Sequence, residues 1–491
     1  MLARFESAVL LGLVLASAGA ARAELIHPVE TPASPVAEHA AAPGPYGRGV
    51  QALERKDFDS AQRAFAEAAK MDPRSAEPLI GLAEVALQRR QAKEAREWLD
   101  KALKLAPKSA QVHVALARYH LVDGKPAKAE AELKSALALE PGNVRVQMAL
   151  GDLYVNELKS PIQALEHYRA VIARDARNGA AHYGLGMALA GTGKAALAEE
   201  EFRTAAGISP KNPLPLLALG RLYSGQGQAD KALAALADAL ARQPGFVAAL
   251  TDRGDLFLDR GDAAPALKEY RLAARSAPKS GLPQLKIGMA LHALARLDEA
   301  EAAYRGAIAL DPRMALAYNN LAWMYFERGK DPAQALAWAR KAVELAPLAA
   351  AFHDTLGWIL RGQGELAEAE KVLVAAVKMK PETAETWHHL GVVHLERKDE
   401  LKAIAAFRPA EGGDPQGLRA RPRRAREARS LIGRCAVRHA ARCSLREPRR
   451  LAGHARSPSA AVRGHDGRIA PRPARGRGRG PSAGAPCRRA A

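Results

Sequence analysis

The apolar and polar positions of this chain follow a unit of about 34 residues that returns from residue 42 to residue 415. A proline marks each return, and the spacing of these markers is 34 or 35 residues. The markers are Pro73, Pro107, Pro141, Pro210, Pro244, Pro278, Pro312, Pro347, Pro381 and Pro415, with Ala176 where a proline is missing. Because proline cannot continue a helix, each marker predicts the end of one helical unit and the turn into the next.

Small and large residues keep fixed places within the unit. Alanine stands twelve residues before all eleven markers, at Ala61, Ala95, Ala129, Ala164, Ala198, Ala232, Ala266, Ala300, Ala335, Ala369 and Ala403. A glycine or alanine, such as Gly254, recurs near the middle of the first helical half of each unit. A bulky residue, such as Tyr270, lies eight residues before most markers, in the second half. Small residues let two helices approach closely and large ones fill the adjoining space, so the pattern predicts pairs of antiparallel helices.

Two units carry one extra residue, and each has a proline at that point. Ser160-Pro161 and Asp331-Pro332 are typical of an N-cap followed by proline at the first helical position. The insertions are therefore expected in turns, where they leave the helical faces in phase.

This register closely resembles the tetratricopeptide-repeat (TPR) family over residues 42–415. The resemblance implies an all-α solenoid of about eleven helix-turn-helix repeats. It also implies a right-handed superhelix whose concave groove is lined mainly by first helices and holds a protein or peptide partner. No repeat alone covers its apolar face, and stacking buries these faces in one continuous core.

The N-terminus is typical of a secretory signal peptide over residues 1–23. Arg4 supplies a positive charge, Ala8 to Ala20 form an apolar segment, and Ala21-Arg22-Ala23 is a cleavage site. An uncleaved membrane anchor is the alternative. A Pro/Ala-rich linker follows over residues 24–41. We therefore expect a periplasmic or secreted protein, cleaved after Ala23, with peripheral envelope association and no nucleic-acid partner in that compartment.

Charge divides the chain into two parts. The formal net charge is +20, and residues 408–491 hold 22 Arg, no Lys and five acidic residues, which is 22 − 5 = +17. Residues 416–491 are too poor in apolar residues to form a core, so we predict a disordered Arg-rich tail. Three interpretations of it stay open: a polyanion-binding tail, an inert tail, or a frameshift product of GC-rich coding sequence.

The motifs of common catalytic sites do not occur in the sequence. It contains no P-loop, no H-E-x-x-H and no G-x-S-x-G, and His388, His389 and His394 lack the spacing of a metal site. We therefore expect no cofactor, no metal and no enzymatic activity. One asparagine, Asn320, stands where nucleocytoplasmic O-GlcNAc transferases carry an asparagine ladder, so that specialisation is not predicted.

The TPR pattern also predicts where a partner binds. The face of the first helix opposite the second helix should line the groove, and in repeats eight to ten it carries Met289, Asn319, Trp323, Phe326, Asp354 and Trp358. Trp323 and Trp358 take equivalent places, and an exposed pair of large aromatic rings is typical of a binding site. The alternative is that both rings pack on neighbouring repeats.

The sequence thus favours a non-catalytic scaffold that holds a partner protein or an extended segment of one. Residues 318–358 resemble the last repeats of exported bacterial TPR proteins of exopolysaccharide and exosortase systems, which implies a role in cell-envelope assembly or exopolysaccharide export. Two alternatives remain: the TPR portion of an enzyme whose catalytic domain is missing, and a polyanion binder acting through the tail.

Overall fold

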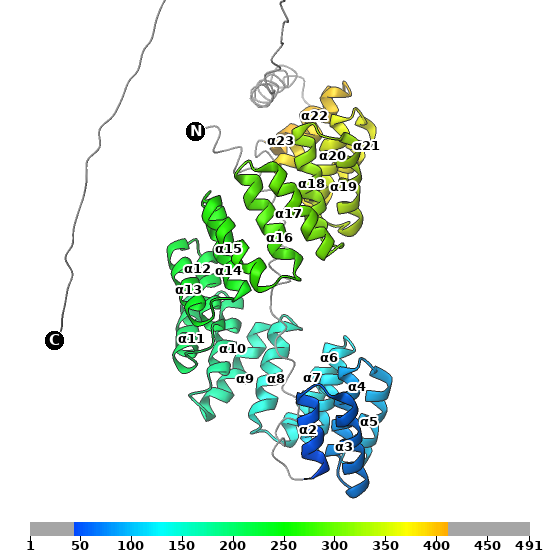
Figure 1. Cartoon of the computed structure of the whole chain (residues 1–491), viewed down its shortest axis with the longest axis vertical. Coiled ribbons are helices and arrows are strands. Elements are labelled where there is room, and N and C mark those ends of the chain that lie inside the picture. The colour runs from blue at the N-terminus through cyan, green and yellow to red at the C-terminus, as the bar shows by residue number, and fades with distance from the viewer. Residues whose placement is uncertain (1–43, 411–491) are drawn as a thin grey trace, which may run out of the picture. The chain divides into compact units, whose positions relative to one another are not determined.

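The computed structural model describes residues 44–410, and every regular element in this range is an α-helix. The helices form eleven consecutive pairs, from α2–α3 to α22–α23 (Figure 1). The first helices are α2 (Pro45–Glu54), α4 (Glu77–Gln88), α6 (Ala110–Val122), α8 (Val144–Asn156), α10 (Gly179–Gly191), α12 (Leu214–Gly225), α14 (Val247–Asp259), α16 (Gly281–Ala293), α18 (Ala315–Arg328), α20 (Ala350–Gly362) and α22 (Ala384–Glu396). The second helices are α3 (Phe58–Met71), α5 (Ala92–Leu105), α7 (Pro126–Leu139), α9 (Pro161–Arg174), α11 (Ala195–Ile208), α13 (Ala229–Arg242), α15 (Ala263–Ser276), α17 (Leu297–Leu310), α19 (Pro332–Leu345), α21 (Leu366–Met379) and α23 (Glu400–Ala410). The predicted all-α repeat architecture is confirmed.

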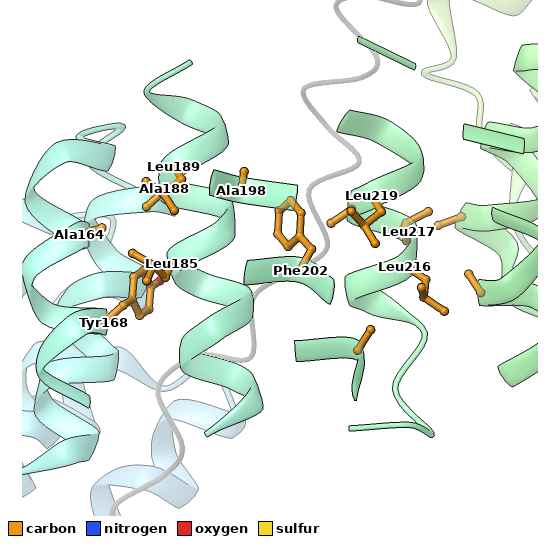
Figure 2. Packing of buried hydrophobic residues seen from close by; sticks show 14 of the residues in the cluster. Ala164, Tyr168, Leu185, Ala188, Leu189, Ala198, Phe202, Leu216, Leu217 and Leu219 are labelled. Carbon is orange, nitrogen blue, oxygen red and sulfur yellow. The ribbon is translucent and has the colours of Figure 1, made fainter. Parts of the chain in front are cut away.

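The two helices of each pair pack where the recurring small residues of the unit meet the recurring large ones. All eleven alanines that precede the markers by twelve residues have 0% of their surface exposed. A Cβ atom added to Gly254 would lie 2.4 Å from the Tyr270 ring, so α14 can approach α15 only because the residue is glycine. Figure 2 shows the rings of Tyr168 and Phe202 among buried alanine and leucine side chains of the same core cluster. The expected packing of small against large residues is therefore present.

Each helix packs on its partner and then on the helix that follows in the chain. Consecutive first helices also touch, for example α8 with α10 and α18 with α20. Buried residues consequently run from repeat to repeat rather than gathering in one centre, as a solenoid requires.

The turns within the pairs share a left-handed residue. Glycine fills this place in six repeats, for example Gly261 with φ of 84°. The other five repeats put Lys56, Arg90, Lys159, Ala295 and Lys398 there, all with positive φ. A side chain makes this conformation unfavourable, so the neighbouring helices must hold these turns in place.

The two insertions lie in turns, directly before α9 and α19, with Pro161 and Pro332 as first helical residues. The Asp331 side chain caps α19 by accepting a hydrogen bond from the Gln334 backbone amide, whereas the Ser160 hydroxyl donates to the Leu158 carbonyl instead. The last helix, α23, is described as far as Ala410 and includes Pro409. The predicted signal peptide, linker and tail lie outside the described residues. Within residues 44–410, no helix is long and apolar enough to cross a membrane.

Candidate partner-binding face

One residue of every first helix follows directly after its small central residue. We call these eleven residues the first-helix column. They are Val50, Glu84, Arg118, Asp152, Met187, Arg221, Asp255, Met289, Trp323, Trp358 and Val392. Arg118 and Glu84 show that column residues of successive repeats meet, because the guanidinium of the one lies 2.9 Å from the carboxylate of the other and both side chains are buried.

Further links join the column to the first helix of the next repeat. The Arg221 Nε donates to Asp252 at 2.6 Å, and the Lys286 ammonium donates to both oxygens of Asp255 at 2.9 and 3.0 Å. In each case the partner stands 31 residues later. The Tyr270 hydroxyl also donates to Asp255, at 2.6 Å. Because these charges are compensated by direct partners, their burial costs far less than burial of isolated ions would.

An aromatic and ionic cluster links α20 to α22. The His389 ring stacks on Trp358 with 4.0 Å between ring centroids, and its Nδ1 lies 2.9 Å from Asp354. Burial by itself would lower the pKa of His389, but the Asp354 carboxylate beside it raises that pKa above its ordinary value overall. The Arg361 guanidinium covers the Trp358 ring at 4.5 Å and pairs with Glu396. This end of the array is therefore closely packed.

The structure corrects the expectation of an exposed tryptophan pair. Trp358 is only 8% exposed, because His389 of the next first helix covers its ring. Met289 and Asp354 are likewise buried, with 4% and 1% exposure. For Trp358, the alternative interpretation, in which the ring packs on a neighbouring repeat, is therefore the one that the structure shows.

The other three predicted site residues, Asn319, Trp323 and Phe326, are half-buried and lie together on α18. The rings of Trp323 and Phe326 are 6.0 Å apart. Phe326 also packs closely on α20, since a Cβ atom added to Gly362 would lie 2.4 Å from its ring. The face of α18 is therefore the part of the predicted site that stays partly open.

Three polar side-chain atoms of α18 are buried without a hydrogen-bond partner in the described part of the chain. They are the Asn319 Oδ1, the Asn320 Nδ2 and the Trp323 Nε1. Asn320 lies beside Tyr304: burial raises the pKa of Tyr304, and the Asn320 amide opposes that rise in part, yet Nδ2 makes no geometrically good hydrogen bond. Each unpaired buried group costs about 1–3 kcal/mol, and a face with two donors and one acceptor suits a polypeptide backbone.

No group of three or more His, Cys, Asp and Glu side chains within residues 44–410 is arranged to hold a metal ion. Of the histidines considered in the sequence, His389 and His394 are buried at 6% and 5% exposure, and His389 is paired with Asp354. The interior position of these two rings, with carboxylates as neighbours, agrees with a role in packing.

Models of the tetratricopeptide repeat match residues 52–119, 110–153, 162–213, 217–281, 285–350 and 355–418. With these matches and the helix pairs described above, the chain belongs to the tetratricopeptide repeat family. Members of this architecture are scaffolds that bind protein or peptide partners.

Individual relatives are similar over shorter stretches or more loosely. A segment of 56 residues is 46% identical to Peroxisome biogenesis protein 5 of Arabidopsis thaliana, which is 11% of this chain and 8% of that protein. The chain thus spans less than a tenth of that relative's length. Among solved structures, yeast Tom70 matches with 16% identity and a TM-score of 0.43, over 82% of this chain and 97% of that one. YrrB, a TPR protein with an unusual peptide-binding site, matches with 25% identity and a TM-score of 0.33, over 39% and 97%.

Proposed function

We propose that this protein is a non-catalytic scaffold that binds an extended segment of a partner polypeptide across α18. The observation that carries the proposal is the set of three buried, unpaired polar atoms of Asn319, Asn320 and Trp323. Asn319 and Trp323 are four residues apart and share one side of the helix, and Asn320 lies next to them. A peptide backbone would offer a carbonyl to the two donors and an amide to the Asn319 oxygen.

Affinity at this site would come from apolar contact as well as from hydrogen bonds. Trp323 and Phe326 are half-buried, and tryptophan is a common anchor at protein interfaces. Satisfying three hydrogen-bonding groups in a partly dry site would add about 0.5–1.5 kcal/mol for each group.

The test begins with selection of linear peptides from a random display library against the full chain. Binding of a selected peptide is then measured by calorimetry for the wild type, for Trp323→Phe and for Trp338→Phe. Trp323→Phe removes the unpaired N–H and keeps an aromatic ring, so the dissociation constant should rise about tenfold. Trp338→Phe makes the same change on the second helix α19 and should leave affinity unaltered. A library that yields no peptide sensitive to Trp323, or equal effects of both variants, would refute the proposal.

We propose further that the scaffold works outside the cytoplasm, in the periplasm or as a secreted protein, and serves cell-envelope assembly or exopolysaccharide export. Residues 1–23 support export, and the resemblance of residues 318–358 supports the pathway. Fusion of alkaline phosphatase to the chain, with and without residues 1–23, tests the location in a bacterial host. Phosphatase activity that does not depend on residues 1–23 would argue against export by this segment.

A further inference from the structure

Asp152 stands apart from the other acidic residues of the first-helix column. Glu84 is paired with Arg118 and Asp255 with Lys286, whereas no basic group in residues 44–410 forms an ion pair with Asp152. The Asp152 side chain is half-buried on α8, and its Oδ1 accepts a hydrogen bond from the Tyr168 hydroxyl at 2.7 Å. Burial raises the pKa of this carboxyl to about 6, which is the effect of a carboxylate held in low-dielectric surroundings without a cation.

The Asp255 site of the same chain shows which group the Asp152 site lacks. Asp255 takes the same place in its first helix as Asp152 does in α8. Each carboxylate accepts a hydrogen bond from a tyrosine hydroxyl of its own repeat: Asp152 from Tyr168, sixteen residues later, and Asp255 from Tyr270, fifteen residues later. Asp255 has one more partner, the ammonium group of Lys286, which reaches both of its oxygens. The two sites therefore share the carboxylate and the phenol but differ in the cation.

Glycine explains why the cation is lacking at the Asp152 site. The position of α10 that corresponds to Lys286 of α16 is Gly184, two places before the small central residue in each case. A Cβ atom on Gly184 would lie 2.4 Å from the Tyr168 ring, so a side chain at this point of α10 would require that ring to move. Consequently the chain supplies the carboxylate and its phenol but no lysine of its own at that position.

A second titratable group lies within electrostatic reach of Asp152. The Tyr183 side chain of α10 is half-buried, and its hydroxyl makes no hydrogen bond to another described residue. Burial raises the pKa of Tyr183, the nearby Arg221 opposes that rise, and Asp152 adds to it, so the phenol lies within electrostatic reach of both. Arg221 is itself paired with Asp252 and does not neutralise Asp152.

We propose that Asp152 is a binding position for the ammonium group of a lysine side chain from a partner polypeptide. In this arrangement the ammonium takes the place that Lys286 takes at Asp255. Asp152 lies on α8 and the peptide site proposed above lies on α18, five repeats further along the chain. The proposed lysine-binding position can therefore be tested independently of the α18 site.

The experiment uses the full chain and n-butylammonium chloride, which reproduces the end of a lysine side chain. Carboxyl-carbon NMR follows Asp152 and Asp255 during the titration, while tetramethylammonium chloride keeps the ionic strength constant. The expected result is a saturable response of Asp152 in the millimolar range and a decrease of its pKa by about one or more. Asp255 is the internal control and should not respond, because Lys286 already occupies it.

Thermal unfolding gives a second measurement that does not depend on the assignment of one signal. Butylammonium should raise the melting temperature of the wild type, relative to tetramethylammonium, and should have no such effect on Asp152→Asn. Equal responses of Asp152 and Asp255, or an equal effect of neutral n-butanol, would overturn the proposal. So would an Asp152 pKa below 3.8 without any additive, since a basic residue from outside residues 44–410 would then already occupy the site.

Discussion

Asp152→Asn should make the array more stable at neutral pH, although it removes a charged residue that makes a good hydrogen bond. The carboxylate is half-buried, has no ion-pair partner in the described residues and accepts a single side-chain hydrogen bond, from Tyr168. Asparagine keeps an oxygen that can accept the same hydrogen bond, and it carries no charge that burial would penalise.

The magnitude follows from the pKa of Asp152, which burial raises from 3.8 to about 6. A pKa difference of about two units between the folded and unfolded states corresponds to about 3 kcal/mol. This value is the upper limit of the increase in unfolding free energy that Asp152→Asn can give. The folded state holds the proton more tightly than the unfolded state. Stability from this group is therefore fully present below pH 3.8 and is lost as the pH rises through about 6. The advantage of Asp152→Asn should accordingly be near zero at pH 3.8 and reach its maximum above pH 6.

The assay is denaturant unfolding of wild type and Asp152→Asn at several pH values between 4 and 8. All other titrating groups are shared by the two proteins, so the difference between their unfolding free energies isolates residue 152. Titratable neighbours are few: the neutral Tyr168 phenol donates a hydrogen bond to the carboxyl from α9, and the neutral Tyr183 phenol lies within electrostatic reach on α10. A variant that is less stable than the wild type at pH 7.5, or an advantage that grows toward acidic pH, would refute the reasoning.

Four further predictions concern packing, turns and the α20–α22 cluster. Ala232→Leu should lower the unfolding free energy by about 1–3 kcal/mol, because Ala232 is fully buried, whereas Ala237→Leu on the exposed side of the same helix should cost little; similar melts of the two variants would show the register to be wrong. Trp358→Ala should cost about 3–5 kcal/mol, since its buried ring stacks on His389, and a loss no larger than that of Trp323→Ala in the same denaturation assay would contradict this packing. Ala295→Gly should stabilise the array by about 0.5–1 kcal/mol by relieving a positive φ of 57°, and an unchanged melting temperature would speak against strain in that turn. Asp354→Asn should bring the pKa of His389, followed by imidazole NMR, below 6.5, because burial would then be opposed by less negative charge; a pKa that stays raised would mean that another group sets it.

Sequence alone was sufficient for the repeat, because the constraint that creates it is local. A pair of helices can cross closely only where a small residue meets a large one, so Ala232 and the Gly254–Tyr270 pair had to recur at fixed spacing. The turn residues Gly124 and Gly261 and the two proline insertions follow from equally local backbone rules. The number of helix pairs could therefore be predicted from the amino-acid sequence.

The partner-binding face depends on contacts between repeats, which the repeat pattern does not specify. Trp323 and Trp358 hold equivalent places in the unit, yet Trp358 is covered because the next first helix supplies His389, whereas the corresponding residue after Trp323 is Thr355. Asp255 and Asp152 differ for the same reason, since Lys286 reaches the one and Gly184 leaves the other without a cation. Burial and pairing at these positions are decided by side chains more than 30 residues away, so only the tertiary structure determines which residues of the column stay available to a partner.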